Sequence, residues 1–303
     1  MICKDFGKLT AGVVINTTKP HAAKALEYLL SEMDKRKMPY LAESASALSA
    51  GLSGQGVTFS EMLSRAQWLI VIGGDGTILS AVRELTDLGI PILGINPGES
   101  FGFLAEIPYS EIPSALDNIL SGRFDIEERA TLSARFTTEE GIVKEERALN
   151  DLAFVRGLDA RVVEMRVMVN GEYLTTYAVD GLILSTATGS TAYSLSAGGP
   201  VMYPGLDAFL LTPVCPHSLM NRPMIFPKGT AIEIENATIG RDVHISADGR
   251  VVLTLGMNER VSVSLEKSVK FLTTRQHSFT QKLRKKMGWQ GGLKESEQDK
   301  FAK

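Results

Sequence analysis

The stretch Trp68-Leu69-Ile70-Val71-Ile72-Gly73-Gly74-Asp75-Gly76-Thr77 decides the fold of the first part of the chain. Its first five residues form an uninterrupted apolar run, which is typical of a strand buried on both faces of a sheet. The next four residues form a glycine-rich turn, and the chain then shows helical periodicity from Thr77 to Leu88. A strand, a glycine turn and a helix in this order predict an anion site at the start of the helix.

Strands alternate with helices on both sides of this stretch. The predicted elements are strands over residues 11–16, 68–72 and 90–95, and helices beginning at Pro20, over 77–88 and over 112–120. Ser44 to Gly56 is rich in Ser, Ala and Gly, and we expect it to be a mobile surface loop. Alternating strands and helices predict parallel β-α-β units, so residues 1–123 are expected to form an α/β domain with a Rossmann-like parallel sheet.

Beyond this first domain, strand-like segments follow one another with few helical patterns between them. Asn170-Gly171 and Asp248-Gly249 each separate two such segments, and both dipeptides favour two-residue hairpin turns. We therefore expect a β-rich, β-sandwich-like domain over residues 124–274. Residues 275–303 are expected to form a C-terminal helix and tail that pack back on the N-terminal domain. The basic run from Lys282 to Lys286 is interpreted as a solvated helix face.

Composition excludes several classes of protein. The 303 residues are enough for two domains, and a formal net charge of -3 gives no broad attraction to nucleic acid or to an anionic membrane. The two cysteines, Cys3 and Cys215, lie far apart and predict neither a disulfide framework nor a zinc site. The sequence has no apolar run of eighteen residues and no signal-peptide pattern at its start, so we expect a cytoplasmic protein without membrane contact.

The glycine turn contains an unusual carboxylate. No Lys follows the glycines and the G-x-G-x-x-G spacing is absent, so the turn is neither a Walker A loop nor a dinucleotide fingerprint. The carboxylate of Asp75 repels phosphate unless a cation lies between them or unless it accepts a proton from an attacking hydroxyl. Both roles belong to phosphoryl transfer. The alternative is that Asp75 only caps the helix that begins near Thr77.

A second polar segment extends from Asp180 to Pro200. A buried strand runs into a turn of Ser, Thr and Gly residues, and a short helical stretch follows, closed by two glycines and a proline. Hydroxyl groups and exposed backbone N–H groups suit a phosphorylated ligand, and Tyr193 can stack on a flat ring. The alternative is a capped helix with a buried Tyr193.

These segments together resemble NAD kinases over nearly the whole chain. The family's Gly-Gly-Asp-Gly turn is matched by Gly73 to Gly76, its Asn-acidic pair by Asn150-Asp151, and its Thr-Gly-Ser-Thr-Ala-Tyr-Ser segment by Thr188 to Ser194. Asn96 to Leu104 is similar to the family's Asn-x-Gly-x-x-Gly-Phe-Leu stretch. The Thr-Gly-Ser-Thr-Ala-Tyr segment is highly specific, whereas lipid kinases of the diacylglycerol type and phosphofructokinases have similar glycine turns.

The resemblance implies transfer of the γ-phosphoryl group of ATP, or of another donor, to the 2′-hydroxyl of the adenosine ribose of NAD, which gives NADP. Asp75 is then expected to be the general base on that hydroxyl. Asn150 is expected to contact the adenine edge, and Asp151, shorter than the Glu of many members, a ribose hydroxyl. The phosphate-binding residues are expected to be Gly73, Gly74, Gly76 and Thr77. The other residues expected at NAD are Arg161, Ala178, Asp180, Thr191, Ala192, Tyr193, Ser194, Ser196 and Arg250, with Gly76.

The resemblance also implies Mg²⁺ or Mn²⁺ bound with ATP, and the sequence predicts no dedicated protein cage for the ion. The four histidines, His21, His217, His244 and His277, have no ligand-like spacing and are interpreted as structural or surface residues. NAD and ATP are the expected partners, and a homo-oligomer, a dimer or a tetramer, is expected to form through the β-rich domain. The sequence leaves open the phosphoryl donor, NAD against NADH, and the number of subunits.

Two other functions share part of these patterns. A lipid kinase of the diacylglycerol type shares only the glycine turn. It needs an apolar pocket for an acyl chain, and the polar segment 188–196 argues against such a pocket. A non-catalytic NAD(P) sensor would keep the fold, but the intact Asp75 argues against it.

Overall fold

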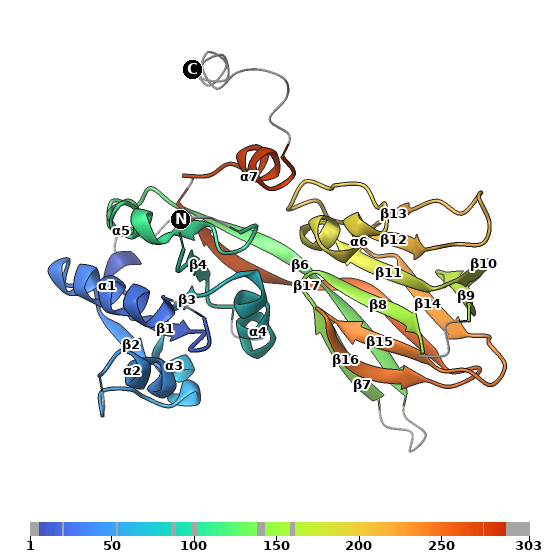
Figure 1. Ribbon diagram of the computed structural model, residues 1–303, viewed down its shortest axis with the longest axis horizontal. Coiled ribbons are helices and arrows are strands. Elements are labelled where there is room, and N and C mark those ends of the chain that lie inside the picture. The colour runs from blue at the N-terminus through green and yellow to red at the C-terminus, as the bar shows by residue number, and fades with distance from the viewer. Residues whose placement is uncertain are drawn as a thin grey trace, which may run out of the picture. The chain divides into compact units, whose positions relative to one another are not determined.

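The structure is a computed structural model, which describes residues 6–19, 21–52, 54–85, 89–98, 102–137, 143–157, 161–274 and 276–288 (Figure 1). Its contacts divide the chain into two compact units. Unit 1 comprises Met1–Ile78, Ile90–Ile126 and Phe271–Lys303, and unit 2 comprises Leu79–Gly89 and Glu127–Lys270. Three elements continue along the chain from one unit into the other: α4 (Asp75–Leu85), β6 (Asp125–Thr137) and β17 (Arg260–Thr273). The domain limits at residues 123 and 274 stay a prediction.

Unit 1 contains a parallel sheet. Its strand order is β4-β3-β1-β2, with β5 paired to β4. All of these pairs are parallel, and Phe271 at the end of β17 also pairs in parallel with Ile92 of β4. The strands are β1 (Ala11–Ile15), β2 (Tyr40–Ala42), β3 (Trp68–Ile72), β4 (Ile92–Asn96) and β5 (Ile107–Pro108). The predicted α/β domain with a parallel sheet is confirmed.

Helices cover both faces of this sheet. On one face, Val13 and Ile70 of the strands share a core with Leu29 of α1 and Leu116 of α5. On the other face, a Cβ atom built on Gly12 of β1 would lie 3.1 Å from the side chain of Met62 in α3. Strands covered on both sides are apolar throughout, as β3 is. The helices of unit 1 are η1 (Phe6–Lys8), α1 (Ala22–Lys35), α2 (Ser44–Ser49), α3 (Phe59–Arg65), η2 (Tyr109–Glu111), α5 (Ile112–Leu120) and α7 (Phe279–Lys286).

The prediction of a loop over residues 44–56 is wrong for its first part, which forms α2. The carboxylate of Glu43 accepts the backbone N–H groups of Ala45 and Ser46, both at 2.8 Å, and so caps the helix start. Ser46 is fully buried, and its Oγ accepts the N–H of Ile15 at 3.1 Å. A small polar residue thus serves as an internal hydrogen-bond partner, which composition alone does not show. Ser53 lies outside the described residues, as does Pro20.

The prediction of a solvated basic face on the C-terminal helix is wrong at Lys282. Helix α7 begins with a capping box formed by Ser278 and Gln281. Lys282 is buried, and its Nζ lies 2.6 Å from Oε2 of Glu106, whereas Arg284, Lys285 and Lys286 are exposed. A surface helix can bury one lysine of a basic run when a buried carboxylate is present to pair with it.

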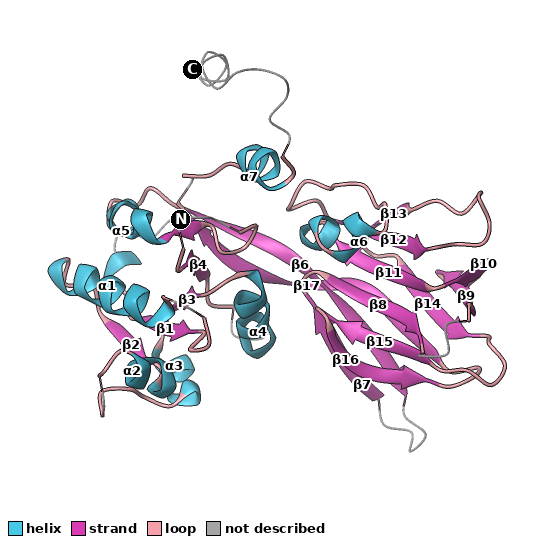
Figure 2. Cartoon of the chain, in the orientation of Figure 1, coloured by secondary structure: helices cyan, strands magenta, loops and turns pink. Residues whose placement is uncertain are grey.

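Unit 2 contains two antiparallel sheets (Figure 2). One has the order β10-β9-β14-β17, with β6 paired to β17 and β7 paired to β6. The other has the order β13-β12-β11-β8-β15-β16. The remaining strands are β7 (Val143–Ala148), β8 (Asp151–Arg156), β9 (Val163–Val169), β10 (Glu172–Val179), β11 (Gly181–Thr186), β12 (Ala208–Val214), β13 (Met224–Pro227), β14 (Ala231–Asn236), β15 (Val243–Ala247) and β16 (Arg250–Leu255).

The two sheets of unit 2 share one apolar core. Val167 and Val263 of the first sheet and Phe154 and Ile245 of the second belong to the same buried cluster. Such face-to-face packing confirms the β-sandwich-like fold. Both predicted hairpins form, with positive φ angles at Asn170 (50°), Gly171 (83°), Asp248 (49°) and Gly249 (78°).

Among the described residues, the structure has no helix that is both long and apolar enough to cross a membrane.

Candidate active site

The glycine turn joins β3 to α4, as predicted. The N–H of Gly73 donates to the carbonyl of Ile95 at 2.8 Å, and a Cβ atom at Gly73 would lie 2.3 Å from Oγ1 of Thr77. Gly74 and Gly76 instead face open space. The Oγ1 of Thr77 accepts a hydrogen bond from Nδ2 of Asn16 at 3.3 Å, so the ends of β1 and β3 meet at the turn. Open space beside glycine backbone is what a bound phosphate needs.

Asp75 is the first residue of α4, but its carboxylate does not bind the N–H groups of its own helix. It accepts three backbone hydrogen bonds from a second turn: Phe103 N–H at 2.9 Å on Oδ2, and Leu104 and Ala105 N–H at 3.0 and 2.9 Å on Oδ1. The alternative role as a helix cap is therefore wrong. The structure instead holds the carboxylate in a fixed orientation by hydrogen bonds to its charged form.

The second turn begins at Gly102, whose N–H donates to the carbonyl of Ala105 at 2.7 Å. An ionised carboxylate has about four acceptor positions, two on each oxygen. The described N–H groups occupy both positions on Oδ1 of Asp75 and one on Oδ2. Oδ2 therefore has one position at which it can accept the proton of a hydroxyl group.

In unit 2, Asp248 binds the start of β8. Its carboxylate accepts the backbone N–H groups of Leu149, Asn150 and Asp151 at 3.0, 2.8 and 3.3 Å. In return, the N–H of Asp248 donates to the carbonyl of Asp151 at 3.0 Å. The hairpin between β15 and β16 thus fixes the backbone of the predicted Asn-acidic pair.

The segment that begins at Thr188 packs against the same pair. Thr186 donates its N–H to the carbonyl of Asn150 at 2.9 Å and its hydroxyl to the carbonyl of Leu149 at 2.6 Å. The Oγ1 of Thr186 also accepts the N–H of Gly189 at 3.0 Å. A Cβ atom on Gly189 would lie 2.0 Å from the carbonyl oxygen of Asn150, so only glycine permits this approach.

Burial and charge act together on the two carboxylates. Burial and, to a smaller extent, the neighbouring charge of Asp248 raise the pKa of Asp151 to about 6, against a hydrogen bond from the backbone of Tyr193 that lowers it. Burial also raises the pKa of Asp248, and the three backbone N–H groups and the charge of Arg83 oppose that rise. A buried carboxylate whose pKa is raised by burial and by the charge of a second, half-buried carboxylate is typical of a functional site.

The other residues predicted around the adenine lie in η3 (Thr188–Thr191), in α6 (Tyr193–Ser196) or, for Ala192, between the two. Thr191 and Ala192 are half-buried, and Ser196 is exposed. The side chain of Tyr193 is 44% exposed, so the alternative of a buried tyrosine is wrong. Ser194 is fully buried, and its hydroxyl pairs with that of Thr212 at 2.8 Å. Ser194 therefore supports α6 through its side chain.

Three predicted positions have contacts elsewhere in unit 2. Oδ1 of Asp180 pairs with Nε of Arg156 at 2.9 Å. The carbonyl of Ala178 accepts the N–H of His217 at 3.0 Å, and Arg161 is exposed. Within the described part of the chain, no hydrogen bond or ion pair links Arg161, Ala178 or Asp180 to the Asn150-Asp151 pair.

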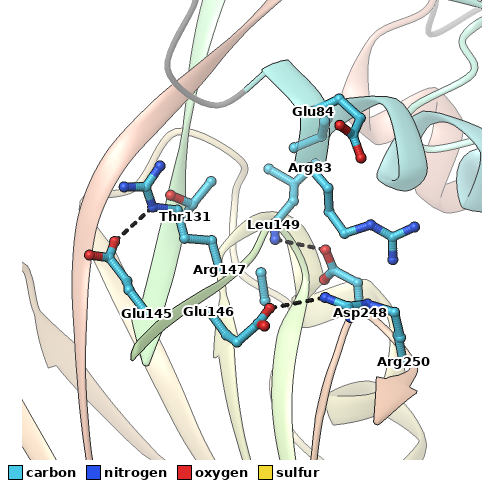
Figure 3. Close-up of a pocket in the computed structure, with 11 residues that line it drawn as sticks. Arg83, Glu84, Thr131, Glu145, Glu146, Arg147, Leu149, Asp248 and Arg250 are labelled. Atoms are coloured by element: carbon cyan, nitrogen blue, oxygen red, sulfur yellow. Dashed lines mark hydrogen bonds and ion pairs between the residues drawn. The ribbon is translucent and has the colours of Figure 1, made fainter. Parts of the chain in front are cut away.

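A polar cavity of about 790 Å³ adjoins this pair in unit 2 (Figure 3). Arg250, a predicted site residue, pairs across it with Glu146, at 3.0 Å between Nη2 and Oε2. Arg147 pairs with Glu145 at 2.8 Å, and Arg83 projects from α4 near Asp248. The lining residues are Val82, Arg83, Glu84, Thr131, Glu145, Glu146, Arg147, Ala148, Leu149, Asp248 and Arg250.

Sequence reasoning missed Gly102, Asp248 and Arg83. Asp248 was assigned only to a hairpin turn, although Asp at a positive φ in such a turn can equally bind distant backbone. The quoted Asn96 to Leu104 stretch contains Gly102, and its match to the family could have directed attention there. Nothing in the sequence pattern places Arg83 next to a residue 165 positions away.

The described residues include no cluster of three or more His, Cys, Asp or Glu side chains that could hold a metal ion. His277 pairs with Glu111, at 2.9 Å between Nε2 and Oε2, and Nδ1 of His244 lies 2.9 Å from Oγ1 of Thr254.

Comparisons with known proteins identify the family of the chain. The family model of the ATP-NAD kinase N-terminal domain matches residues 16–124, and that of the ATP-NAD kinase C-terminal domain matches residues 149–273. The NAD kinase of Desulforamulus reducens is 35% identical over 286 residues, which are 94% of this chain and 99% of that protein.

Two solved structures share the fold. Yeast NADH kinase complexed with NADH has a TM-score of 0.83 at 23% identity, covering 95% of this chain and 89% of that chain. An NAD kinase from Archaeoglobus fulgidus in complex with ATP has a TM-score of 0.69 at 22% identity, covering 92% and 98%. These two structures show the fold alone, whereas the two family models and the Desulforamulus relative show that the chain belongs to the NAD kinase family.

Proposed function

We propose that this protein is an NAD kinase that transfers the γ-phosphoryl group of ATP to the 2′-hydroxyl of the adenosine ribose of NAD. One observation carries the proposal: in a chain of this family, the carboxylate of Asp75 is held by three backbone N–H groups and keeps one acceptor position on Oδ2. A fixed carboxylate with one open position suits a general base.

The reaction needs a base because a ribose hydroxyl is a poor nucleophile at neutral pH. Oδ2 of Asp75 takes the hydroxyl proton while the new O–P bond forms and the bond between the γ-phosphorus and ADP breaks. General-base help of this kind contributes roughly 10²–10⁴-fold to the rate. Positioning and neutralisation of the phosphate charge supply the rest.

NAD recognition is assigned to unit 2. The amide of Asn150 contacts the adenine edge, and the carboxylate of Asp151 accepts a ribose hydroxyl. The exposed ring of Tyr193 stacks on the adenine, next to Thr191, Ala192 and Ser196. The arginines of the polar cavity, Arg250 among them, supply positive charge for phosphate groups. Asp180 on the nicotinamide side, Arg161 and Ala178 stay predictions.

The phosphoryl donor is assigned to the glycine turn. Gly74 and Gly76 border open space, and Gly73 and Thr77 shape the turn around it. Mg²⁺ or Mn²⁺ bound with ATP would supply positive charge for the phosphoryl oxygens. Three N–H groups already occupy most acceptor positions of the Asp75 carboxylate. The ion is therefore expected to be held by the phosphates and not by this carboxylate.

A homo-oligomer, a dimer or a tetramer, is also proposed. Several large apolar side chains of unit 2 are exposed, among them Leu219 at 84% and Met220 at 86%. Apolar groups of this size are commonly covered by a partner subunit. Light scattering coupled to size-exclusion chromatography measures the mass, and a monomer at micromolar concentration contradicts this part of the proposal.

The function is tested by incubating the purified protein with ATP, Mg²⁺ and NAD and measuring NADP. Asp75→Asn should still bind NAD but lose about 10²–10⁴-fold in turnover. Asp34→Asn, an exposed Asp of α1, is the control and should retain the activity of the parent. No NADP with any metal or donor contradicts the proposed function, and normal turnover of Asp75→Asn removes Asp75 as the base.

A further inference from the structure

The C-terminal helix carries a lysine that is buried together with a carboxylate of unit 1. The side chains of Lys282 and Glu106 are 6% and 8% exposed, and their Nζ and Oε2 atoms are 2.6 Å apart. Two charges removed from water are stable only when they stay paired. The position of Glu106 is therefore tied to that of α7.

Glu106 directly follows the turn that binds Asp75. Residues 103–105 donate their N–H groups to the carboxylate of Asp75, and residue 106 is the next in the chain. The second oxygen of Glu106 accepts the N–H of Thr274 at 3.3 Å, just before α7. The rings of Phe103 and Phe279 also meet, with centroids 6.3 Å apart. The turn is thus bound by Asp75 and by α7 with its leading segment.

We propose that Lys282 is a positioning residue for the proposed base: by pairing with Glu106 it holds the turn at residues 102–106, whose N–H groups orient the carboxylate of Asp75. The inference rests on the proposed function. Lys282 does not touch Asp75, and it acts through the backbone between them. A shift of the turn by a fraction of an ångström weakens three hydrogen bonds at once, because all three donors are consecutive residues.

The basic residues further along α7 do not share this environment. Arg284, Lys285 and Lys286 are exposed, whereas Lys282 is buried. Lys286→Met therefore removes the same charge from the same helix without touching the pair and is the matched control for Lys282→Met.

The first test measures kcat and the dissociation constant of NAD. Lys282→Met should lower kcat by about ten- to a hundredfold, because a small misplacement of a catalytic group costs that much. The dissociation constant of NAD should change less than about twofold, since the NAD contacts proposed in unit 2 are untouched. Lys286→Met should leave both values unchanged, and Lys282→Arg, which keeps the charge, should recover most of the lost kcat.

A double-mutant cycle separates positioning from general damage to the fold. In an Asp75→Asn background, Lys282→Met should lower the residual kcat by less than about twofold, because the turn acts on the reaction through Asp75. An equal loss of kcat in both backgrounds overturns the proposal. If Lys282→Met does not fold, the neutral pair Lys282→Met with Glu106→Gln replaces it, with the same expected results.

Hydrogen exchange provides a readout that does not depend on activity. The N–H groups of residues 103–105 should exchange about tenfold faster in Lys282→Met, or in the neutral pair, than in the parent and in Lys286→Met. Unchanged exchange overturns the proposal. If the parent forms no NADP, the proposed function fails separately, and exchange alone then decides whether Lys282 holds this turn.

Discussion

Asp75 and Gly102 approach so closely that a Cβ atom built on Gly102 would lie 2.0 Å from Oδ1 of Asp75. The approach lets the three residues after Gly102 present their N–H groups to the carboxylate at 2.9 to 3.0 Å. Glycine is required at this position because any side chain would occupy the space of the carboxylate itself.

Replacing Gly102 with Ala should therefore damage catalysis more than NAD binding. The new methyl group must displace the Asp75 side chain or the turn, and either movement breaks the orientation of the base. We expect kcat to fall by about a hundredfold or more, with a dissociation constant of NAD close to that of the parent. Steady-state kinetics and calorimetric titration of NAD measure the two quantities.

Gly157→Ala is the control for Gly102→Ala, because the nearest atoms to its new methyl group would lie 3.7 and 3.8 Å away. It should leave kcat and the dissociation constant of NAD unchanged. A Gly102→Ala protein with the kcat of the parent would show that the carboxylate does not need its present orientation.

Replacing Gly189 with Ala should instead damage NAD binding and stability. The Cβ atom would lie 2.0 Å from the carbonyl oxygen and 2.4 Å from the carbonyl carbon of Asn150, and backbone atoms cannot move aside as a flexible side chain can. Overpacking of this kind typically costs about 1–3 kcal/mol of unfolding free energy. Urea unfolding and NAD titration check the result.

Gly256→Ala is the counterpart in the same unit, because its nearest contact would be a side-chain oxygen of Glu259 at 3.4 Å. Its free energy of unfolding should stay within about 0.5 kcal/mol of that of the parent. Equal losses of stability and NAD affinity in Gly189→Ala and Gly256→Ala would mean that the approach to Asn150 is not the cause.

Local patterns were sufficient to predict most of the fold. The apolar run at 68–72 lies in a sheet covered on both faces, and Asn170-Gly171 and Asp248-Gly249 form their hairpins, because each depends on residues adjacent in sequence. The prediction of a loop over residues 44–49 is wrong because the composition of Ser and Ala hides a helix that Glu43 caps locally and that tertiary contacts of Ser46 bury. The burial of Lys282 depends on Glu106, 176 residues away.

The site followed the same rule. Asp75 and Asn150-Asp151 stand in recognisable motifs, so the sequence could indicate them. Their hydrogen-bond partners could not be predicted, because both contacts use backbone N–H groups, which every residue except proline has. The N–H groups of Phe103 to Ala105 bind the carboxylate of Asp75, and the carboxylate of Asp248 binds the N–H groups of Leu149 to Asp151. Which N–H group binds a carboxylate is decided by the path of the chain and not by the residue type.

Replacing Asp248 with Ala should weaken NAD binding without abolishing the base. The change leaves the N–H groups of Leu149, Asn150 and Asp151 without their acceptor, and an unsatisfied buried N–H costs about 1–3 kcal/mol. We expect the dissociation constant of NAD to rise by about tenfold or more, because Asn150 and Asp151 lose their fixed backbone. Asp248→Asn, which keeps one acceptor oxygen, should lie between Ala and the parent. Asp248→Ala with unchanged NAD affinity in a calorimetric titration would remove this role.

The stability of the protein should depend on pH through Asp151. Its pKa is about 6 in the folded protein, above the ordinary value of 3.8, because the carboxyl is buried beside Asp248. Between pH 3.8 and pH 6, Asp151 is therefore protonated in the folded protein and ionised in the unfolded chain. The contribution of Asp151 to stability rises as the pH falls through 6. Above pH 6 the buried charge costs on the order of 3 kcal/mol.

Asp151→Asn removes that charge, and the sign of its effect follows from the raised pKa. In urea unfolding, the variant should be more stable than the parent at pH 8, and the difference should shrink through pH 6 and vanish near pH 4. For NAD binding, in contrast, the charge of Asp151 should be favourable. The NAD affinity of the parent should fall below pH 6, because a protonated Asp151 no longer accepts the ribose hydroxyl with a full carboxylate. The weaker NAD affinity of Asp151→Asn should stay constant over the same pH range. A parent and variant with parallel stability curves from pH 8 to pH 4 would show that Asp151 does not titrate in this range.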